Sequence, residues 1–178
     1  AKALKRKKKP GLVDRIVSEA KKRPLKPKGS NAETYIRLYY KDVPPQDIHA
    51  EKPATLWGAA KAHLEFSMTR SRGKALIRAY NPTLKADGWK TNHSVVEIVA
   101  DDMPFLVDSI TALLNSRNLT VHLVVHPVLK TKRDKTGKLV RVLSPNESDS
   151  GAISETMLRF EVSQQPPKQL ENITKEIT

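Results

Sequence analysis

The fold of this chain is decided by residues 95–129, which read VVEIVADDMPFLVDSITALLNSRNLTVHLVVHPVL. The β-branched run at 95–100 predicts a strand. Apolar residues then recur at spacings of three and four, which predicts a helix over 104–117. Both alternating faces of 119–129 are largely apolar, so we expect this segment to be a strand covered on both sides, at the centre of a sheet.

Further strand signals lie on both sides of this stretch. Residues 75–80 end at the turn signal Asn81-Pro82, and 139–143 follow a turn containing Gly137. Apolar and polar residues alternate over 156–162, which predicts a half-buried strand. A last helix opens at Pro166-Pro167 and is still in its pattern where the sequence stops, so we expect a domain truncated before its last strand.

This order of elements predicts an α+β fold of the ferredoxin-like, split βαβ type, with an antiparallel sheet and helices on one face. We assign the α+β domain to residues 73–178. A helical segment precedes it at 31–72, and its second helix is predicted to begin with Thr55 as the cap. Residues 1–30 are predicted to be a basic arm and linker.

The formal net charge of +13 is concentrated in the arm. Residues 1–28 contain 12 Lys or Arg and two acids, whereas the other 150 residues carry 20 bases and 17 acids. Such an arm binds phosphate or anionic lipid through counterion release. No aromatic residue is interleaved with these bases as a stacking platform would need, so we favour a solvated tail flanking a short helix at 11–22. Nucleic acid is therefore not the favoured partner.

Composition argues against several classes of protein. Without cysteine there is no disulfide, no thiolate nucleophile and no thiolate-bound metal. No run approaches the roughly 20 apolar residues of a membrane-spanning helix, and no apolar core follows the basic start as in a secretory signal. We expect a cytoplasmic protein with no membrane partner. The seven glycines are scattered, so neither G-x-G-x-x-G nor a phosphate loop is present to hold a dinucleotide.

The histidines do not predict a metal site. His122 and His126 are four residues apart on a predicted strand, which places them roughly 13 Å from each other, too far to share an ion. His49, His63 and His93 have no partners nearby in the sequence, and we expect them to be surface or capping residues. We therefore assign no metal, catalytic or cofactor-binding residue to this chain.

Aromatic residues and carboxylates also have structural explanations. Asp101 and Asp102 precede the central helix and are placed to accept its free N–H groups. We expect the largest aromatic side chains to pack between helices and sheet rather than to form a binding cage; these are Tyr39, Tyr40, Trp57 and Trp89.

The turn after the first central strand resembles the corresponding turn of ACT domains, which are small amino-acid-sensing modules. In those domains the strand ends in an acidic residue, a proline and a glycine. This chain departs from that pattern at Phe105, where glycine would leave room for a bound amino acid and Phe would fill the space or join the core. The candidate effector or interface turn comprises Asp101, Asp102, Met103, Pro104 and Phe105.

A wider resemblance covers about residues 31–163. Seven stretches in order look like the N-terminal region of the large bacterial NAD-specific glutamate dehydrogenases: YYKDVPPQD (39–47), LWGAA (56–60), YNPTL (80–84), GW (88–89), HSVVEIV (93–99), DDMPFLVDS (101–109) and LTVHLVVHPV (119–128). Enzymes of that family are several times longer than this chain. They begin with ACT-like modules and carry the dehydrogenase core far downstream.

The resemblance implies that the parent protein uses NAD to deaminate L-glutamate to 2-oxoglutarate and ammonium, while this chain holds no cofactor. Three functions remain open for the chain itself. It is a non-catalytic regulatory or assembly module whose partners are downstream modules and further copies, or an amino-acid-sensing module with an effector pocket. The third possibility is binding of nucleic acid or an anionic surface by the arm.

Overall fold

A computed structural model describes residues 10–22, 25 and 31–178, and the basic run at 5–9 lies outside this range, as does most of the linker. At the centre is an antiparallel sheet in the order β1-β2-β6-β4-β5, with β3 also paired to β6. The strands are β1 (Leu76–Tyr80), β2 (Ser94–Asp101), β3 (Val121–Val125), β4 (Val128–Arg133), β5 (Leu139–Val142) and β6 (Ala152–Val162).

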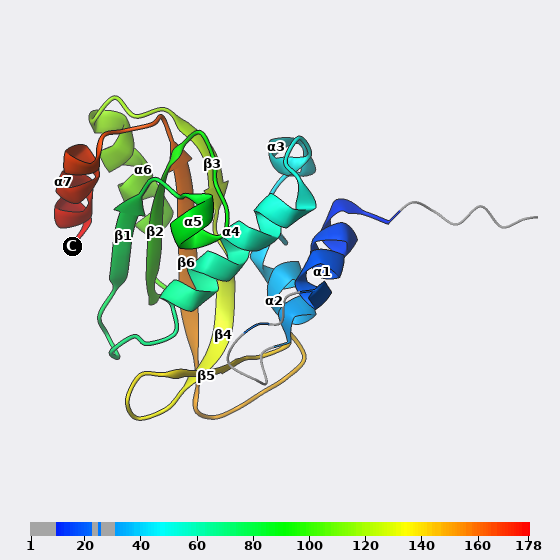
Figure 1. Cartoon of the computed structure of the whole chain (residues 1–178). Coiled ribbons are helices and arrows are strands. Elements are labelled where there is room, and N and C mark those ends of the chain that lie inside the picture. The colour runs from blue at the N-terminus through cyan, green and yellow to red at the C-terminus, as the bar shows by residue number, and fades with distance from the viewer. Residues whose placement is uncertain (1–9, 23–24, 26–30) are drawn as a thin grey trace, which may run out of the picture.

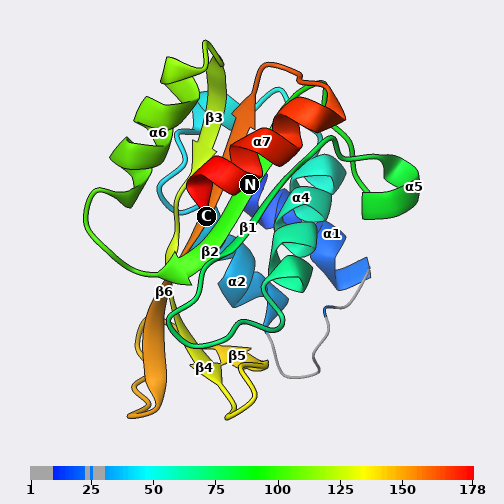
Figure 2. The same ribbon diagram turned by 90° about the vertical axis from the view of Figure 1, so that its left-hand side faces the viewer.

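Helices cover both faces of the sheet (Figure 1). The predicted helices on one face are confirmed as α6 and α7, and Figure 2 shows them in front of the strands with α1, α2 and α4 behind. The N-terminal helices thus have the opposite face as their partner surface. The helices are α1 (Leu12–Lys22), α2 (Ala32–Tyr39), α3 (Pro45–Ile48), α4 (Pro53–Phe66), α5 (Leu84–Asp87), α6 (Leu106–Ser116) and α7 (Pro167–Ile177).

The central strand of the sheet is β6, not the segment 119–129. One side of β6 pairs with β2, and its other side is shared between β3 and β4. The predicted single strand is interrupted at His126-Pro127, because proline has no N–H to donate to a neighbour. Among the described strands β3 pairs with β6 alone, so the prediction of a central position was wrong.

The other neighbour of β2 is β1, which precedes it in the chain. In the split βαβ arrangement, a strand after the second helix returns to pair beside the first. In the described residues β1 lies in that place, with Leu76 opposite Val99 and Tyr80 opposite Val95. The expected last strand beyond α7 stays a prediction.

The helices α2 and α4 begin in different ways. Asn31 caps α2, since its side-chain oxygen accepts hydrogen bonds from the backbone N–H groups of Glu33 and Thr34 at 3.0 and 3.3 Å. The predicted cap at Thr55 was wrong, because α4 begins at Pro53, where a proline without an N–H is favourable. Thr55 lies inside the first turn.

Candidate functional site

The candidate turn connects β2 to α6 and is open to solvent. Phe105 is 76% exposed and Met103 is 50% exposed. Phe105 has φ 62°, a left-handed conformation that costs a non-glycine residue about 1–2 kcal/mol. The expectation that Phe105 fills a ligand space or joins the core was wrong. The backbone keeps the conformation that glycine adopts freely, while the side chain extends into solvent.

Asp101 and Asp102 were predicted to cap α6, and this prediction was wrong. α6 begins after Phe105 with no side-chain cap. Asp101 instead accepts a hydrogen bond from Arg70 Nη2 at 2.5 Å, and the backbone N–H of Asp102 donates to the Ser154 carbonyl at 3.0 Å. The acid at the end of β2 therefore anchors the loop that follows α4.

Arg70 belongs to a buried charge network. Its Nε donates to Glu155 Oε1 at 2.5 Å, and Arg133 Nε donates to the same carboxylate at 3.0 Å. The side chains of Arg70 and Glu155 are each 1% exposed. The Thr131 hydroxyl also donates to Glu155. Because Asp101 supplies a second carboxylate, the two guanidinium groups are matched in charge, as buried ions require.

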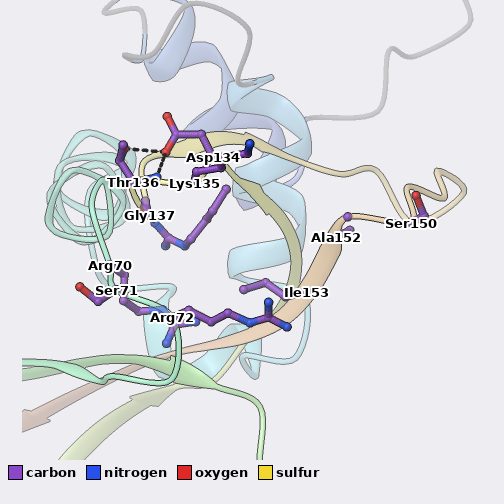
Figure 3. Close-up of a pocket in the computed structure, with 12 residues that line it drawn as sticks. Arg70, Ser71, Arg72, Asp134, Lys135, Thr136, Gly137, Ser150, Ala152 and Ile153 are labelled. Carbon is purple, nitrogen blue, oxygen red and sulfur yellow. Dashed lines mark hydrogen bonds between the residues drawn. The ribbon is translucent and has the colours of Figure 1, made fainter.

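A pocket of about 670 Å³ lies against this network, framed by loop 70–72, turn 133–137 and residues 150–153 (Figure 3). The loop and the turn are held together by the backbone N–H of Arg70, which donates to the Gly137 carbonyl at 3.0 Å. A Cβ at Gly137 would lie 2.2 Å from the Arg70 carbonyl oxygen, so no larger residue fits without movement. Figure 3 shows residues 150–153 across the opening from both segments.

Sequence reasoning missed this pocket, because its walls come from segments far apart in the chain. Arg70 and Glu155 are 85 positions apart. A signal was nevertheless present. Residues 70–74 and 133–138 together contain six Lys or Arg and one acid, within a region that is otherwise nearly neutral.

A second group of buried charges lies beneath the N-terminal helices. Arg78 pairs with Glu97 at 2.6 Å, and the side chain of Glu97 is fully buried. Burial raises the pKa of the Glu97 carboxyl, and Arg78 opposes that rise. The guanidinium of Arg159, also fully buried, lies 3.5 Å from Glu161 and 5.8 Å from the centre of the Tyr39 ring. None of its three nitrogens has a hydrogen-bond partner within the described part of the chain.

The histidines lie in different environments, and His49 is exposed at the end of α3, as predicted. His63 was expected at the surface but is fully buried, with Nδ1 2.8 Å from the Tyr39 hydroxyl. Burial lowers the pKa of His63 well below its ordinary value, and the nearby charge of Arg159 lowers it further. His93 stacks on His122 with ring centres 4.2 Å apart. The described residues contain no group of three or more potential ligands able to hold a metal ion.

The prediction for the large aromatic residues is confirmed. Tyr39, Tyr40, Trp57 and Trp89 are all buried and pack between the helices and the sheet. The Tyr40 hydroxyl donates to the Leu56 carbonyl at 2.6 Å, and burial raises its pKa to about 12. These residues join α2 and α4 to the sheet rather than lining an open site.

The antiparallel sheet, its two covering helices and the strand-to-helix turn define an ACT-like α+β module. The family model described as "Glutamate dehydrogenase, ACT1 domain" matches residues 35–177. The chain belongs to this family. No described helix is both long and apolar enough to cross a membrane.

Two curated relatives are NAD-specific glutamate dehydrogenases. The protein from Halomonas elongata is 32% identical over 163 residues, which are 91% of this chain and 10% of the relative. The protein from Pseudomonas aeruginosa is 32% identical over 91 residues, or 51% of this chain and 6% of the relative. The chain thus matches a tenth or less of the length of these relatives. No solved structure matches it.

Proposed function

We propose that this chain is a non-catalytic regulatory or assembly module of a large NAD-specific glutamate dehydrogenase. The family match over residues 35–177 carries the proposal, because the named relatives are about nine times longer and bear the name of the enzyme. The parent oxidatively deaminates L-glutamate, and NAD binds to a part of the protein outside this chain. The module contacts downstream modules of the same chain and further copies of itself.

The turn from Asp101 to Phe105 is the surface we assign to assembly. Two large apolar side chains, Met103 and Phe105, project from it. A strained backbone at an exposed aromatic residue brings no benefit to the folding of the module itself, which supports a role in contact with another surface.

Light scattering tests this assignment. We expect the purified chain to have a mass above its monomer value of 19.9 kDa and the Phe105→Asp variant to return to the monomer. Leu84→Asp is the matched control, because Leu84 is also exposed, at 61%, but lies on α5. An unchanged mass in Phe105→Asp would remove the turn from the interface. A monomeric chain at every concentration would refute self-assembly through this module.

Amino-acid sensing is the second candidate function. It is favoured by the left-handed backbone at Phe105, which preserves the geometry of a glycine turn despite the larger residue. A thermal-shift screen against the twenty amino acids tests it, because a ligand that binds only the folded state raises the unfolding temperature as its concentration rises. The absence of a shift with every amino acid would count against sensing.

Binding of nucleic acid or an anionic surface remains a prediction about the arm, most of whose bases lie outside the described residues. It requires affinity that falls steeply with salt and disappears when residues 1–28 are deleted. Unchanged binding after the deletion would exclude it.

A further inference from the structure

The pocket between loop 70–72, turn 133–137 and residues 150–153 has the dimensions of a small-molecule site. Its volume of about 670 Å³ lies within the range of roughly 300–1,000 Å³ that is usual for ligand pockets. It lies beside the network of Arg70 and Glu155, apart from the exposed side chains of Met103 and Phe105. No part of the function proposed above accounts for it.

The walls of the pocket are fixed by bonds that do not involve a ligand. Leu139 N–H donates to the Met68 carbonyl at 2.8 Å, and Arg133 Nη1 donates to the Gly137 carbonyl at 2.9 Å. Arg133 Nη2 also donates to the Ser67 carbonyl at 2.9 Å. These bonds clamp the β4–β5 turn against the loop after α4, so the pocket is held open without any conformational change.

The charges that line the pocket do not cancel. Arg70 and Arg133 are neutralised by Glu155 and Asp101, as described above. By contrast, Arg72 and Lys135 are exposed, and neither side chain forms an ion pair or hydrogen bond with any other described residue. Both line the same pocket and are available to a ligand.

The one acid in the turn is occupied locally. Asp134 Oδ1 accepts hydrogen bonds from the Thr136 hydroxyl at 2.6 Å and from the backbone N–H groups of Thr136 and Lys138 at 2.8 and 3.1 Å. These bonds lower the pKa of Asp134 and use its carboxylate to shape the turn. The pocket therefore offers unpaired cations to an incoming group.

We propose that this pocket binds a small molecule through a carboxylate or phosphate group, with Arg72 on one wall and Lys135 on another supplying the positive charge. A guanidinium matches both oxyanions with two parallel N–H donors, and an ammonium adds a compact positive charge. Ser71 also lies on the pocket wall and carries a hydroxyl group that can donate to an anion. The proposal does not depend on the role of the chain in a dehydrogenase.

The test is a titration of the whole chain by nuclear magnetic resonance, following the backbone amides of Gly137 and Gly151. The probes are succinate, inorganic phosphate and succinamide, which has the size of succinate without its charge. A local readout is needed because the arm also attracts anions. We expect saturable shifts of both glycines at millimolar succinate or phosphate and none with succinamide. Saturation by one anion alone identifies the oxyanion that the site takes.

Two variants make the result specific. The double substitution Arg72→Gln and Lys135→Gln is expected to weaken the response about tenfold or more, since each contact is a charge-assisted hydrogen bond. Lys168→Gln on α7 removes one charge from another exposed position and should leave the response of the two glycines unchanged. The proposal is overturned if neither anion shifts the two glycines, if succinamide acts equally, or if the double variant responds like the original chain.

Discussion

The two faces of the sheet differ in how they are buried, although the same strands supply both. Towards α6 and α7, β2 and β6 present mostly apolar side chains, such as Ile98 and Phe160, together with uncharged polar residues such as Thr156. Towards the N-terminal helices, the alternate residues of these strands include Glu97 and Arg159, both fully buried. One face is held by transfer of apolar surface from water, and the other also depends on the pairing of charges.

Among substitutions that distinguish the two faces, Glu155→Gln on the charged face is expected to cause the largest loss in free energy of unfolding. The substitution keeps the shape of the side chain but leaves Arg70 and Arg133 without their shared carboxylate. Removing one partner from a buried ionic network costs about 3–5 kcal/mol, and urea unfolding measures the loss. Glu176→Gln is the control, because its pair with Arg117 is exposed and should be worth less than about 1 kcal/mol. Equal losses in both variants would contradict the distinction.

The charged face is also expected to make stability sensitive to acid through His63. Its ordinary pKa is 6.5 and burial lowers it, so the unfolded chain gains a proton below pH 6.5 that the folded chain does not. Stability is therefore retained above that pH and lost as the pH falls. His63 alone contributes a loss on the order of 1 kcal/mol between about pH 7.5 and 5.5.

Urea unfolding across this pH range, compared between the original chain and His63→Gln, isolates the contribution. The free energy of unfolding that is lost on acidification should be smaller in His63→Gln by the contribution of His63. His49→Gln removes an exposed histidine and should leave the pH dependence as it was. A variant at His63 with the original pH dependence would show that this histidine titrates alike in both states.

The apolar face should respond to volume and not to charge. Ile98→Val removes one methylene from a side chain that is 2% exposed, and a loss of about 0.5–1.5 kcal/mol is expected. The loss in free energy of unfolding should be the same at low and high salt, because no ion pair is involved. A loss that changes clearly with salt would mean that the substitution on the apolar face also disturbs the ion pairs on the other face.

The smallest effect is expected at the exposed turn, outside both faces. Phe105→Gly relieves the left-handed strain but adds freedom to the unfolded chain, so the variant should gain at most about 1 kcal/mol. Thermal unfolding measures the difference, with Leu84→Gly as the control for loss of an exposed apolar side chain. A loss of more than about 1 kcal/mol would show that Phe105 packs within the module after all.

The apolar face was predictable from the sequence, whereas the charged face was not. Alternation over 156–162 correctly placed Leu158 and Phe160 on one side of a strand. The same pattern led to the expectation of a half-buried strand, which was wrong, because Arg159 is 0% exposed and Glu161 is 9% exposed. Alternation reports that two faces differ in polarity, but whether a polar face meets water depends on what covers it.

The two candidate sites also differ in how far the sequence predicted them. The turn from Asp101 to Phe105 was proposed from its resemblance to the turn of ACT domains, because its residues are neighbours in the chain, and its role as a site stays a prediction. The pairing of Arg70 with Glu155 was not found, since no local pattern links residues so far apart. Periodicity predicted strands and helices but not the family of the chain. The family was predicted from the resemblance to glutamate dehydrogenases, and the match over residues 35–177 confirmed it.

The central functional claim is that the chain contributes assembly or regulation and no chemistry of its own. The most direct test follows the absorbance of NADH when the purified chain is incubated with L-glutamate and NAD. The account predicts no NADH above the rate without protein. Glutamate-dependent formation of NADH that follows the chain through further purification would contradict it.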